Sequence, residues 1–358
     1  MKMKRIFAAV ASLVMLGAFT ACGSDTSSTS SDANSNANAN NSNSDTDNSN
    51  DTNDTNDNSD SNTDSGSADG KTVGIAMPTK SLERWNRDGE YLKDQFESAG
   101  YKVELKYSDN DTNQQNNDIQ GMIADKVDLL LIAAIDGSTL SQTLSDAKDA
   151  GIPVIAYDRL IMNTDAVSYY VSFDNYTVGK LQGEYVIDAL DLENSDGPYN
   201  IEFTAGDPAD NNAGFFFNGA YDAVKEYIDA GKLKIPSGKK TFEQVATESW
   251  STDKALENMQ NTLASYYSDG TQLDVALCSN DSTALGIAQA IASDYNGKNT
   301  PIVTGQDGDI ANLKNIVDGK QSMTVYKNVN DEAGVTLEVS KAILSGQTPD
   351  AGLVSSLS

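Results

Sequence analysis

The sequence of 358 residues contains no histidine, and this absence removes several kinds of catalytic site. Without histidine the chain cannot build a Ser-His-Asp triad, a Cys-His pair, an HExxH zinc site or a histidine pH switch. Its two cysteines, Cys22 and Cys278, cannot form a disulfide framework. The chemistry that remains rests on carboxylates, amides, lysine, arginine and aromatic rings. These groups suit the recognition of polar molecules better than the cleavage of bonds.

Basic residues are scarce as well. The chain has 25 Lys and Arg against 53 Asp and Glu, and its formal net charge is −28. Binding to nucleic acid needs clustered Lys and Arg that face the phosphates. We therefore expect no nucleic-acid partner.

Residues 1–22 predict an export signal. The basic residues of its start are Lys2, Lys4 and Arg5. The apolar run from Ile6 to Phe19 is too short for a stable membrane span, and small residues follow it as at a cleavage site. Cys22, directly after this run, resembles the lipid-attachment cysteine of bacterial lipoproteins. We expect a lipid anchor at Cys22 that holds the protein on the outer face of the cell membrane; the alternative is an ordinary secretory signal.

Residues 23–70 consist almost entirely of Ser, Asn, Asp and Thr, with no Lys or Arg. Such a composition cannot fill a core, so we predict a disordered tether between anchor and folded part. Its Asp spacing at Asp45, Asp47, Ser49 and Asp51 imitates a calcium loop. However, Asn50 stands where that loop needs glycine, and the twelfth position is not Glu. We expect no metal site there, and the tether offers no helix-turn-helix of a transcription regulator.

The segment after residue 70 alternates short β-rich runs with helical patterns. We predict strands at 72–77, 101–107, 127–135, 152–157, 169–173, 200–204, 274–278, 301–304 and 322–326. We predict helices at 84–99, 113–125, 138–150, 176–190, 212–230, 252–267, 283–293, 310–317 and 331–344. This succession indicates an α/β fold with parallel sheets and right-handed crossovers. Its length fits one barrel or two doubly wound sheets, and the break at 172–175 favours two lobes.

Polar side chains gather just beyond the predicted strands, where open parallel sheets bind their ligands. The residues in question are Arg84, Trp85, Asp158, Arg159, Asp210, Asn212, Asn280, Asp307 and Lys327. Carboxylates, amides and guanidinium groups make directional hydrogen bonds to hydroxyls. Trp85 and Trp250 offer flat apolar faces that suit the C–H side of a sugar ring. The sequence thus indicates a polar ligand with many hydroxyls.

Each of these residues also has a plainer interpretation. Asn212 and Asp281 could be helix N-caps, and the run 305–308 could be a simple turn. A tryptophan at a helix start often belongs to the core, and Lys327 alone could be a surface charge. The convergence of several strand ends favours a binding site, because capping alone does not require so many polar groups.

Several motifs resemble bacterial sugar-binding proteins of ABC transporters. The motifs are GIAMPTK at 74–80 with Arg84-Trp85, AYDRLI at 156–161, SFDN at 172–175, DNNA at 210–213, SND at 279–281 and GQD at 305–307. The sequence is most similar to the multiple-monosaccharide-binding and xylose-binding branch, over nearly all of 71–345. The resemblance implies two Rossmann-like lobes joined by a hinge, the type I periplasmic-binding-protein fold. Lobe 1 would comprise 71–173 and 328–358, and lobe 2 would comprise 174–327.

The same resemblance implies which residues contact the sugar. They are Arg84, Trp85, Asp158, Arg159, Asp210, Asn212, Trp250, Asn280, Asp307 and Lys327, with Lys80 and Asp136 as weaker candidates. No cofactor is implied. Proteins of this kind usually continue past the last helix with a strand that returns to the second lobe. This sequence stops at Ser358, which predicts either a truncated sequence or a fold without that strand.

The resemblance implies that the protein captures an aldopentose or aldohexose between two closing lobes. It would work as a monomer and deliver the sugar to the membrane permease of an ABC importer. A sensory module that presents the closed complex to a receptor is the alternative, since one closed surface could serve both tasks. A glycoside-cleaving enzyme would place Asp158 and Asp307 across the glycosidic bond. Arg159 and Lys327 would keep these carboxylates ionised, which is wrong for a general acid. We therefore expect a binding protein and not an enzyme.

Overall fold

The computed structural model describes residues 4–7, 68, 70–350 and 352. Cys22, the predicted cleavage region and nearly all of the predicted tether lie outside the described residues. The expectations about the anchor, the tether and the end of the chain therefore stay predictions. No helix among the described residues has the length and apolar character needed to cross a membrane.

The first sheet has six parallel strands in the order β1-β6-β5-β4-β2-β3. The strands are β1 (Lys4–Phe7), β2 (Thr72–Met77), β3 (Lys102–Tyr107), β4 (Leu129–Ile132), β5 (Val154–Tyr157) and β6 (Val167–Ser172). The helices that cover them are α1 (Glu83–Ser98), α2 (Thr112–Ala124), α3 (Ser141–Asp149) and α10 (Val329–Leu344). β1 falls within the predicted export signal and, as the edge strand of the sheet, pairs with β6.

Both faces of this sheet are buried, and β4 shows why its sequence is continuously apolar. Leu129 and Leu131 belong to the core that α1 and α10 share with the sheet. Leu130 and Ile132 belong to the core on the side of α2 and α3. Because successive strand residues point to opposite faces, a strand covered by helices on both sides needs apolar residues at every position.

The second sheet has four parallel strands in the order β10-β9-β7-β8. The strands are β7 (Tyr199–Thr204), β8 (Leu233–Lys234), β9 (Val275–Cys278) and β10 (Ile302–Val303). The helices of this part are α4 (Asn175–Ala189), α5 (Asn211–Asp229), α6 (Phe242–Val245), the 3-10 turn η1 (Glu248–Trp250), α7 (Thr252–Tyr266), α8 (Asp281–Asp294) and α9 (Ile310–Val317). α4 and α5 pack closely because Gly219 has no side chain; a Cβ there would lie 2.1 Å from the carbonyl oxygen of Tyr176.

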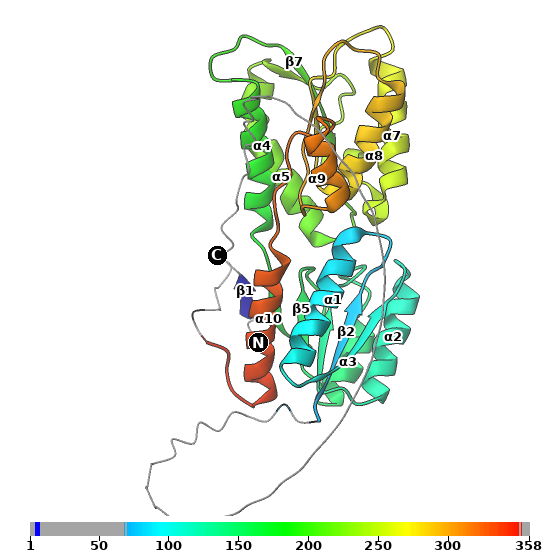
Figure 1. Ribbon diagram of the computed structural model, residues 1–358, viewed down its shortest axis with the longest axis vertical. Helices are drawn as coiled ribbons and strands as arrows, with labels where there is room; N and C mark the ends of the chain where they lie inside the picture. Colours follow the sequence, from blue (N-terminus) through cyan, green and yellow to red (C-terminus); the bar gives the residue numbers. More distant parts are fainter. Residues whose placement is uncertain (1–3, 8–67, 69, 351, 353–358) are drawn as a thin grey trace, which may run out of the picture. The chain divides into compact units, whose positions relative to one another are not determined.

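The chain passes from one sheet to the other between β6 and α4, and returns between residue 326 and α10. α10 packs against α1 and the first sheet, although it follows the second sheet in sequence (Figure 1). The predicted architecture of two parallel α/β lobes is confirmed. In each sheet the strand order reverses, between β2 and β4 and between β7 and β9. The carboxyl ends of strands at such a reversal are where open sheets bind ligands.

One predicted strand is wrong. Residues 322–326 have an alternating pattern, yet the structure shows a single bridge there, between Gln306 and Val325. A regular ladder cannot extend because Asp307 has a positive φ of 104° next to this bridge. Thr324 also turns its hydroxyl to Asp281, at 3.0 Å, instead of packing as a strand residue.

Candidate functional site

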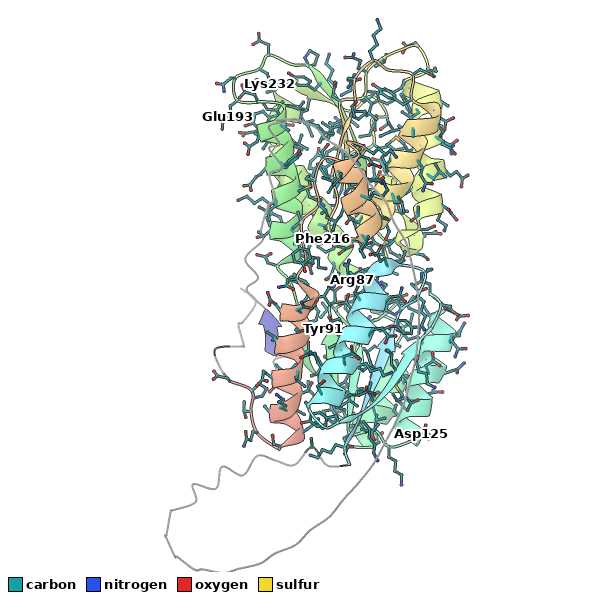
Figure 2. The ribbon with its side chains drawn as sticks, viewed as in Figure 1. Arg87, Tyr91, Asp125, Glu193, Phe216 and Lys232 are labelled. Atoms are coloured by element: carbon teal, nitrogen blue, oxygen red, sulfur yellow. The ribbon has the colours of Figure 1, made fainter. Side chains whose placement is uncertain are left out.

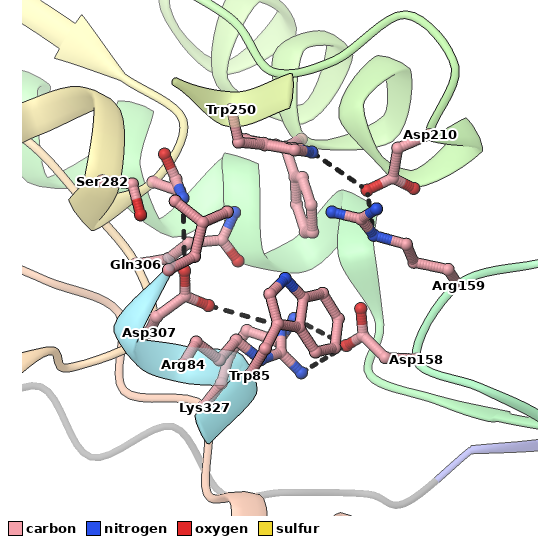
Figure 3. Close-up of a pocket in the computed structure, with 13 residues that line it drawn as sticks. Arg84, Trp85, Asp158, Arg159, Asp210, Trp250, Ser282, Gln306, Asp307 and Lys327 are labelled. Carbon is pink, nitrogen blue, oxygen red and sulfur yellow. Dashed lines mark hydrogen bonds and ion pairs between the residues drawn. The ribbon is translucent and has the colours of Figure 1, made fainter. Parts of the chain in front are cut away.

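A cavity of about 370 Å³, counting the space at its mouth, lies between the carboxyl ends of the two sheets. Its lining residues are Leu82, Arg84, Trp85, Asp158, Arg159, Asp210, Phe216, Trp250, Asn280, Ser282, Gln306, Asp307 and Lys327. Figure 3 shows Trp250 on one side of this space and Trp85 on the other, with polar side chains between them. The lining is mainly charged, amide and aromatic, which suits a small polar ligand.

Arg84, in the first turn of α1, is the centre of a buried charge cluster. Its guanidinium lies 2.5 Å from Asp158, 3.2 Å from both Asp88 and Glu332, and 3.4 Å from Asp307. Asp158 follows β5, Asp88 belongs to α1 and Glu332 belongs to α10. Asp307 follows β10 of the second sheet. Arg84 therefore connects the loop after β5 and the helices α1 and α10, all on the side of the first sheet, to the loop after β10 of the second sheet.

Lys327 completes the cluster. Its ammonium lies 2.9 Å from Asp158 and 4.8 Å from the centre of the Phe173 ring, and the side chain is 2% exposed. Burial alone would raise the pKa of Asp158, but Arg84 and Lys327 together hold it below its ordinary value. Asp158 is thus a carboxylate that accepts hydrogen bonds over the whole neutral range.

Two further carboxyls around Arg84, those of Asp88 and Glu332, behave differently. Burial raises the pKa of Asp88 and, more strongly, that of Glu332, and nearby Asp158 raises both further. Tyr157 donates a hydrogen bond of 2.5 Å to Asp88, whereas Oε1 of Glu332 is buried without a partner among the described residues. Four carboxyls around two cations are in this way compatible with burial, because a neutral carboxylic acid costs less to bury than a carboxylate.

A second polar group lies across the cavity. The indole nitrogen of Trp250 donates to Asp210 at 3.2 Å, and Nε of Arg159 lies 3.1 Å from the same oxygen (Figure 3). The Arg159 contact is an ion pair without hydrogen-bond geometry, since Nε has no hydrogen-bond partner in the part of the chain that the structure describes. Burial raises the pKa of Asp210, and Arg159 opposes this effect. An Nε–H of this kind is free to serve a ligand oxygen.

Two of the lining residues are also helix N-caps. Oδ1 of Asp210 accepts from the amide of Asn212 at the start of α5, and Oδ1 of Asn280 accepts from the amide of Thr283 in α8. The second polar atom of each cap remains for the cavity: Oδ2 of Asp210 faces Trp250, and Nδ2 of Asn280 lies 3.5 Å from Asp307. Capping and ligand contact are therefore compatible roles here.

Three lining residues have a positive φ that is unusual for residues other than glycine: Asp158 at 56°, Trp250 at 54° and Asp307 at 104°. Such conformations cost about 1–3 kcal/mol each and concentrate at functional sites. Gly206 permits the position of Trp250, because a Cβ there would lie 2.0 Å from the indole ring. The backbone thus bears strain that directs these side chains into the cavity.

The cavity brings together nine of the ten principal residues expected from the sequence, the exception being Asn212. Asn212 lies directly behind the lining, where it donates to the carbonyl of Asp158 at 2.9 Å and accepts from Tyr170 at 3.1 Å. In the structure its side chain supports the Asp158 loop, and its expected contact with the sugar stays a prediction.

The two weaker candidates do not reach the cavity. Lys80 is exposed and lies 4.8 Å from the centre of the Tyr107 ring. The carboxylate of Asp136 accepts from the amide and hydroxyl of Ser138, as in a local turn, at 2.8 and 2.6 Å. Each side chain has another partner in the structure, and the expected contacts of both residues with the sugar stay predictions.

Four lining residues were not expected from the sequence: Leu82, Phe216, Ser282 and Gln306. Phe216 follows Asn212 by one helical turn on α5, so helical spacing could have indicated it. Gln306 belongs to the GQD motif. Its buried Oε1 has no partner within residues 4–7, 68, 70–350 and 352, and it is suited to accept from a hydroxyl. The described residues contain no cluster of His, Cys, Asp or Glu side chains that could hold a metal ion.

Comparisons with known proteins agree with this geometry. A family model described as periplasmic binding protein domain matches residues 73–348. The multiple sugar-binding periplasmic receptor ChvE of Rhizobium radiobacter is 44% identical over 287 residues, covering 79% of this chain and 81% of the relative. The D-xylose-binding periplasmic protein of Escherichia coli K12 is 35% identical over 280 residues, covering 78% of this chain and 79% of the relative.

Among solved structures, an ABC transporter solute-binding protein from Clostridium phytofermentans with bound β-D-glucose is similar to this chain. It has a TM-score of 0.77 and 52% identity, and the match covers 78% of this chain and 86% of that one.

Proposed function

The chain belongs to the periplasmic binding protein family, and from this premise we propose that it captures a monosaccharide between its two lobes for delivery to an ABC importer. The single observation that carries the proposal is the cavity itself, in which buried carboxylates, amides and cations from both sheets surround a space between two tryptophans. The similar structure that holds β-D-glucose supports an aldohexose or aldopentose as the ligand.

We propose the following binding mode. The pyranose lies between Trp85 and Trp250, and its hydroxyls bridge the cluster around Arg84 to Asn280 and Asp307 of the second sheet. The closed state is favoured because only there are both halves of the contact set satisfied. A sugar that lacks one hydroxyl leaves a buried polar group unpaired, so selectivity around the ring should be sharp.

A thermal-shift screen tests the proposal. The full-length protein is heated with a series of monosaccharides, among them D-glucose, D-galactose, D-xylose and L-arabinose. A ligand at 100 times its Kd stabilises the native state by about 2.7 kcal/mol, which raises the melting temperature. A disaccharide is the control, because the cavity is small. If no monosaccharide raises the melting temperature, the proposal is wrong.

We propose that the protein binds its sugar without cleaving it. Asp158 is held ionised by Arg84 and Lys327, so it cannot be the general acid of a glycosidase. Incubation with nitrophenyl glycosides should release no nitrophenol. Release that disappears in an Asp158→Asn variant would overturn this part of the proposal.

We further propose that the protein works as a monomer outside the cytoplasmic membrane, with residues 1–22 as export signal, a lipid on Cys22 and 23–70 as a tether. The periplasmic location named for its relatives supports this placement. Removal of the signal would also remove β1 and leave the edge of β6 free. Mass spectrometry of the mature N-terminus tests the anchor: a diacylglycerol on Cys22 is expected, and an unmodified N-terminus would contradict it.

The division into lobe 1 (71–173 and 328–358) and lobe 2 (174–327) also belongs to the proposal, and the packing of α10 against α1 supports it. Sensing remains the alternative to transport, because the similar protein ChvE is named a receptor. A sugar-dependent pull-down from membranes distinguishes the two: recovery of permease subunits supports transport, and recovery of a receptor without them supports sensing.

A further inference from the structure

Outside the cavity, the first turn of α1 holds the main chain of residues 307–310, which lead from the second sheet into α9. Arg87 donates from Nη2 to the carbonyl of Asp307 at 2.9 Å and from Nη1 to that of Gly308 at 3.0 Å. Glu83 accepts from the amide of Ile310 at 2.8 Å. Figure 2 shows Arg87 at the end of α1 that faces the second sheet. We call these contacts the α1 clasp.

Arg87 also has a charged neighbour in the same segment. Its Nη2 lies 3.2 Å from Oδ1 of Asp309, whose side chain is 5% exposed, while Arg87 is 29% exposed. Asp309 is held in turn by Asp281, whose Oδ2 accepts from the Asp309 amide at 2.9 Å. The α1 clasp therefore binds a segment that is itself held in place by a hydrogen bond within the second lobe.

The clasp acts where the backbone is strained. Asp307 has a φ of 104°, and its carboxylate lies in the cavity 3.4 Å from Arg84. A left-handed conformation at a residue other than glycine persists only when its surroundings over-determine it. The amide of Asp307 donates to Val325 at 3.0 Å, and its carbonyl is held by Arg87. Of these two restraints, only Arg87 comes from the opposite lobe.

We propose that Arg87 is a positioning residue for sugar binding: by holding the carbonyls of Asp307 and Gly308, it fixes the Asp307 carboxylate toward the sugar and keeps the lobes closed. Arg87 does not line the cavity, so it acts through Asp307 and not through contact with the sugar. The inference rests on the proposed function. It also explains why arginine stands here, since two parallel N–H groups fit two adjacent carbonyl oxygens better than the single ammonium of lysine.

The expected effect appears in the rate of release. The clasp forms after the lobes meet, so it should slow dissociation and leave association nearly unchanged. The test measures both rates by stopped flow, with whichever monosaccharide gave the largest thermal shift. Arg87→Met should release the sugar at least tenfold faster, and Arg87→Lys should fall between Met and wild type. Lys93→Met removes a positive charge from the same helix and is the matched control, with rates equal to those of wild type.

A second variant keeps the inference testable should Arg87→Met fail to fold. Glu83→Ala removes the acceptor of the Ile310 amide, whose Oε1 also lies 3.8 Å from Nη1 of Arg87, and leaves the two hydrogen bonds from Arg87 to carbonyls in place. It should accelerate release by a smaller factor. If the wild-type chain binds its sugar and Arg87→Met releases it at the wild-type rate, the clasp is wrong and the proposed function stands. If the wild-type chain binds none of the sugars, both fail. Equal slowing of association in all variants would also overturn the inference, because it would indicate general misfolding.

Discussion

Arg84 and Arg87 lie within one turn of the same helix, yet they join the two lobes in different ways. Arg84 is 9% exposed and lies among four carboxyls, of which only Asp307 comes from the second sheet. Arg87 is 29% exposed and binds main-chain carbonyls beyond the cavity. Both arginines meet at Asp307, whose carboxylate faces Arg84 and whose carbonyl faces Arg87.

The difference teaches what each position requires. Arg84 is needed for its charge, because the buried carboxyls around it have few other cations. Arg87 is needed for its geometry, because carbonyl groups are neutral and accept two parallel hydrogen bonds from one guanidinium. The start of one helix therefore supplies a buried cation of the cavity and, three residues later, an arginine that binds the main chain of the second lobe.

The largest effect should come from Arg84→Met. Removal of one partner from a buried ion pair usually costs about 3–5 kcal/mol, because the remaining charges are left uncompensated. We expect the free energy of unfolding to fall by this amount, measured by urea denaturation without sugar. Arg84→Lys retains the charge and should recover most of the stability. A stable Arg84→Met variant would show that the cluster is largely neutral.

Asp307→Ala should abolish sugar binding and leave the fold intact. Hydrogen bonds to charged groups contribute about 1.5–3 kcal/mol each, so the loss of both oxygens should raise Kd at least about 100-fold. Isothermal titration calorimetry measures this change, and circular dichroism checks the fold. The carbonyl that Arg87 binds is still present in this variant. Unchanged affinity would remove Asp307 from the site and contradict the link between the two arginines.

The pH dependence of stability provides a third test, through Asp309 beside Arg87. Burial, followed by the nearby charge of Asp307, raises the pKa of Asp309 to about 7. The charged groups that face it are Asp307, Arg87, Glu83, Arg84 and Asp281. Between about pH 4 and 7 the folded state holds a proton here that the unfolded state has lost, so stability falls as the pH rises.

The corresponding variant is Asp309→Asn. The slope due to this one group is at most about 1.4 kcal/mol per pH unit, and it should disappear in the variant. Urea denaturation at pH 5, 6, 7 and 8 measures it. The other buried carboxyls, such as Glu332, keep their share of the slope in both proteins. Identical slopes in wild type and variant would mean that Asp309 is already ionised at pH 5.

The smallest effect should be that of Arg87→Met on the stability of the sugar-free protein. A partly exposed ion pair contributes about 0–1 kcal/mol, and the clasp is not needed when the lobes are apart. Urea denaturation should therefore give nearly equal free energies of unfolding for variant and wild type. A loss of several kcal/mol would show that Arg87 is structural, and the contrast with Arg84 would then vanish.

Most of the fold could be predicted because the strands of a doubly wound sheet are buried on both faces. β2 and α9 have the predicted bounds, and most other predicted elements differ by a few residues. The failure at 322–326 has a different origin. Thr324 and Gln321 are fixed by hydrogen bonds to Asp281, a long-range contact that no local pattern reveals.

The candidate site could be predicted to the extent that it follows strand ends. Asp158 comes directly after β5, Asn280 two residues after β9 and Asp307 four residues after β10, so topology brings them to the same edge. The carboxyls behind Arg84 could not be found in this way, because Asp88 and Glu332 lie inside helices and look like ordinary helical acids. The positive φ of Asp307 and the reach of Arg87 depend on how the two sheets meet, which the sequence does not state.

The two tryptophans of the chain, Trp85 and Trp250, both line the cavity, and they are only 3% and 4% exposed. Trp85 lies under two guanidinium groups, each 4.9 Å from its ring centre, while Trp250 meets Phe216 edge-on. All indole emission of the protein therefore originates from the walls of one small chamber. Intrinsic fluorescence should report occupancy of that chamber directly, without any attached dye.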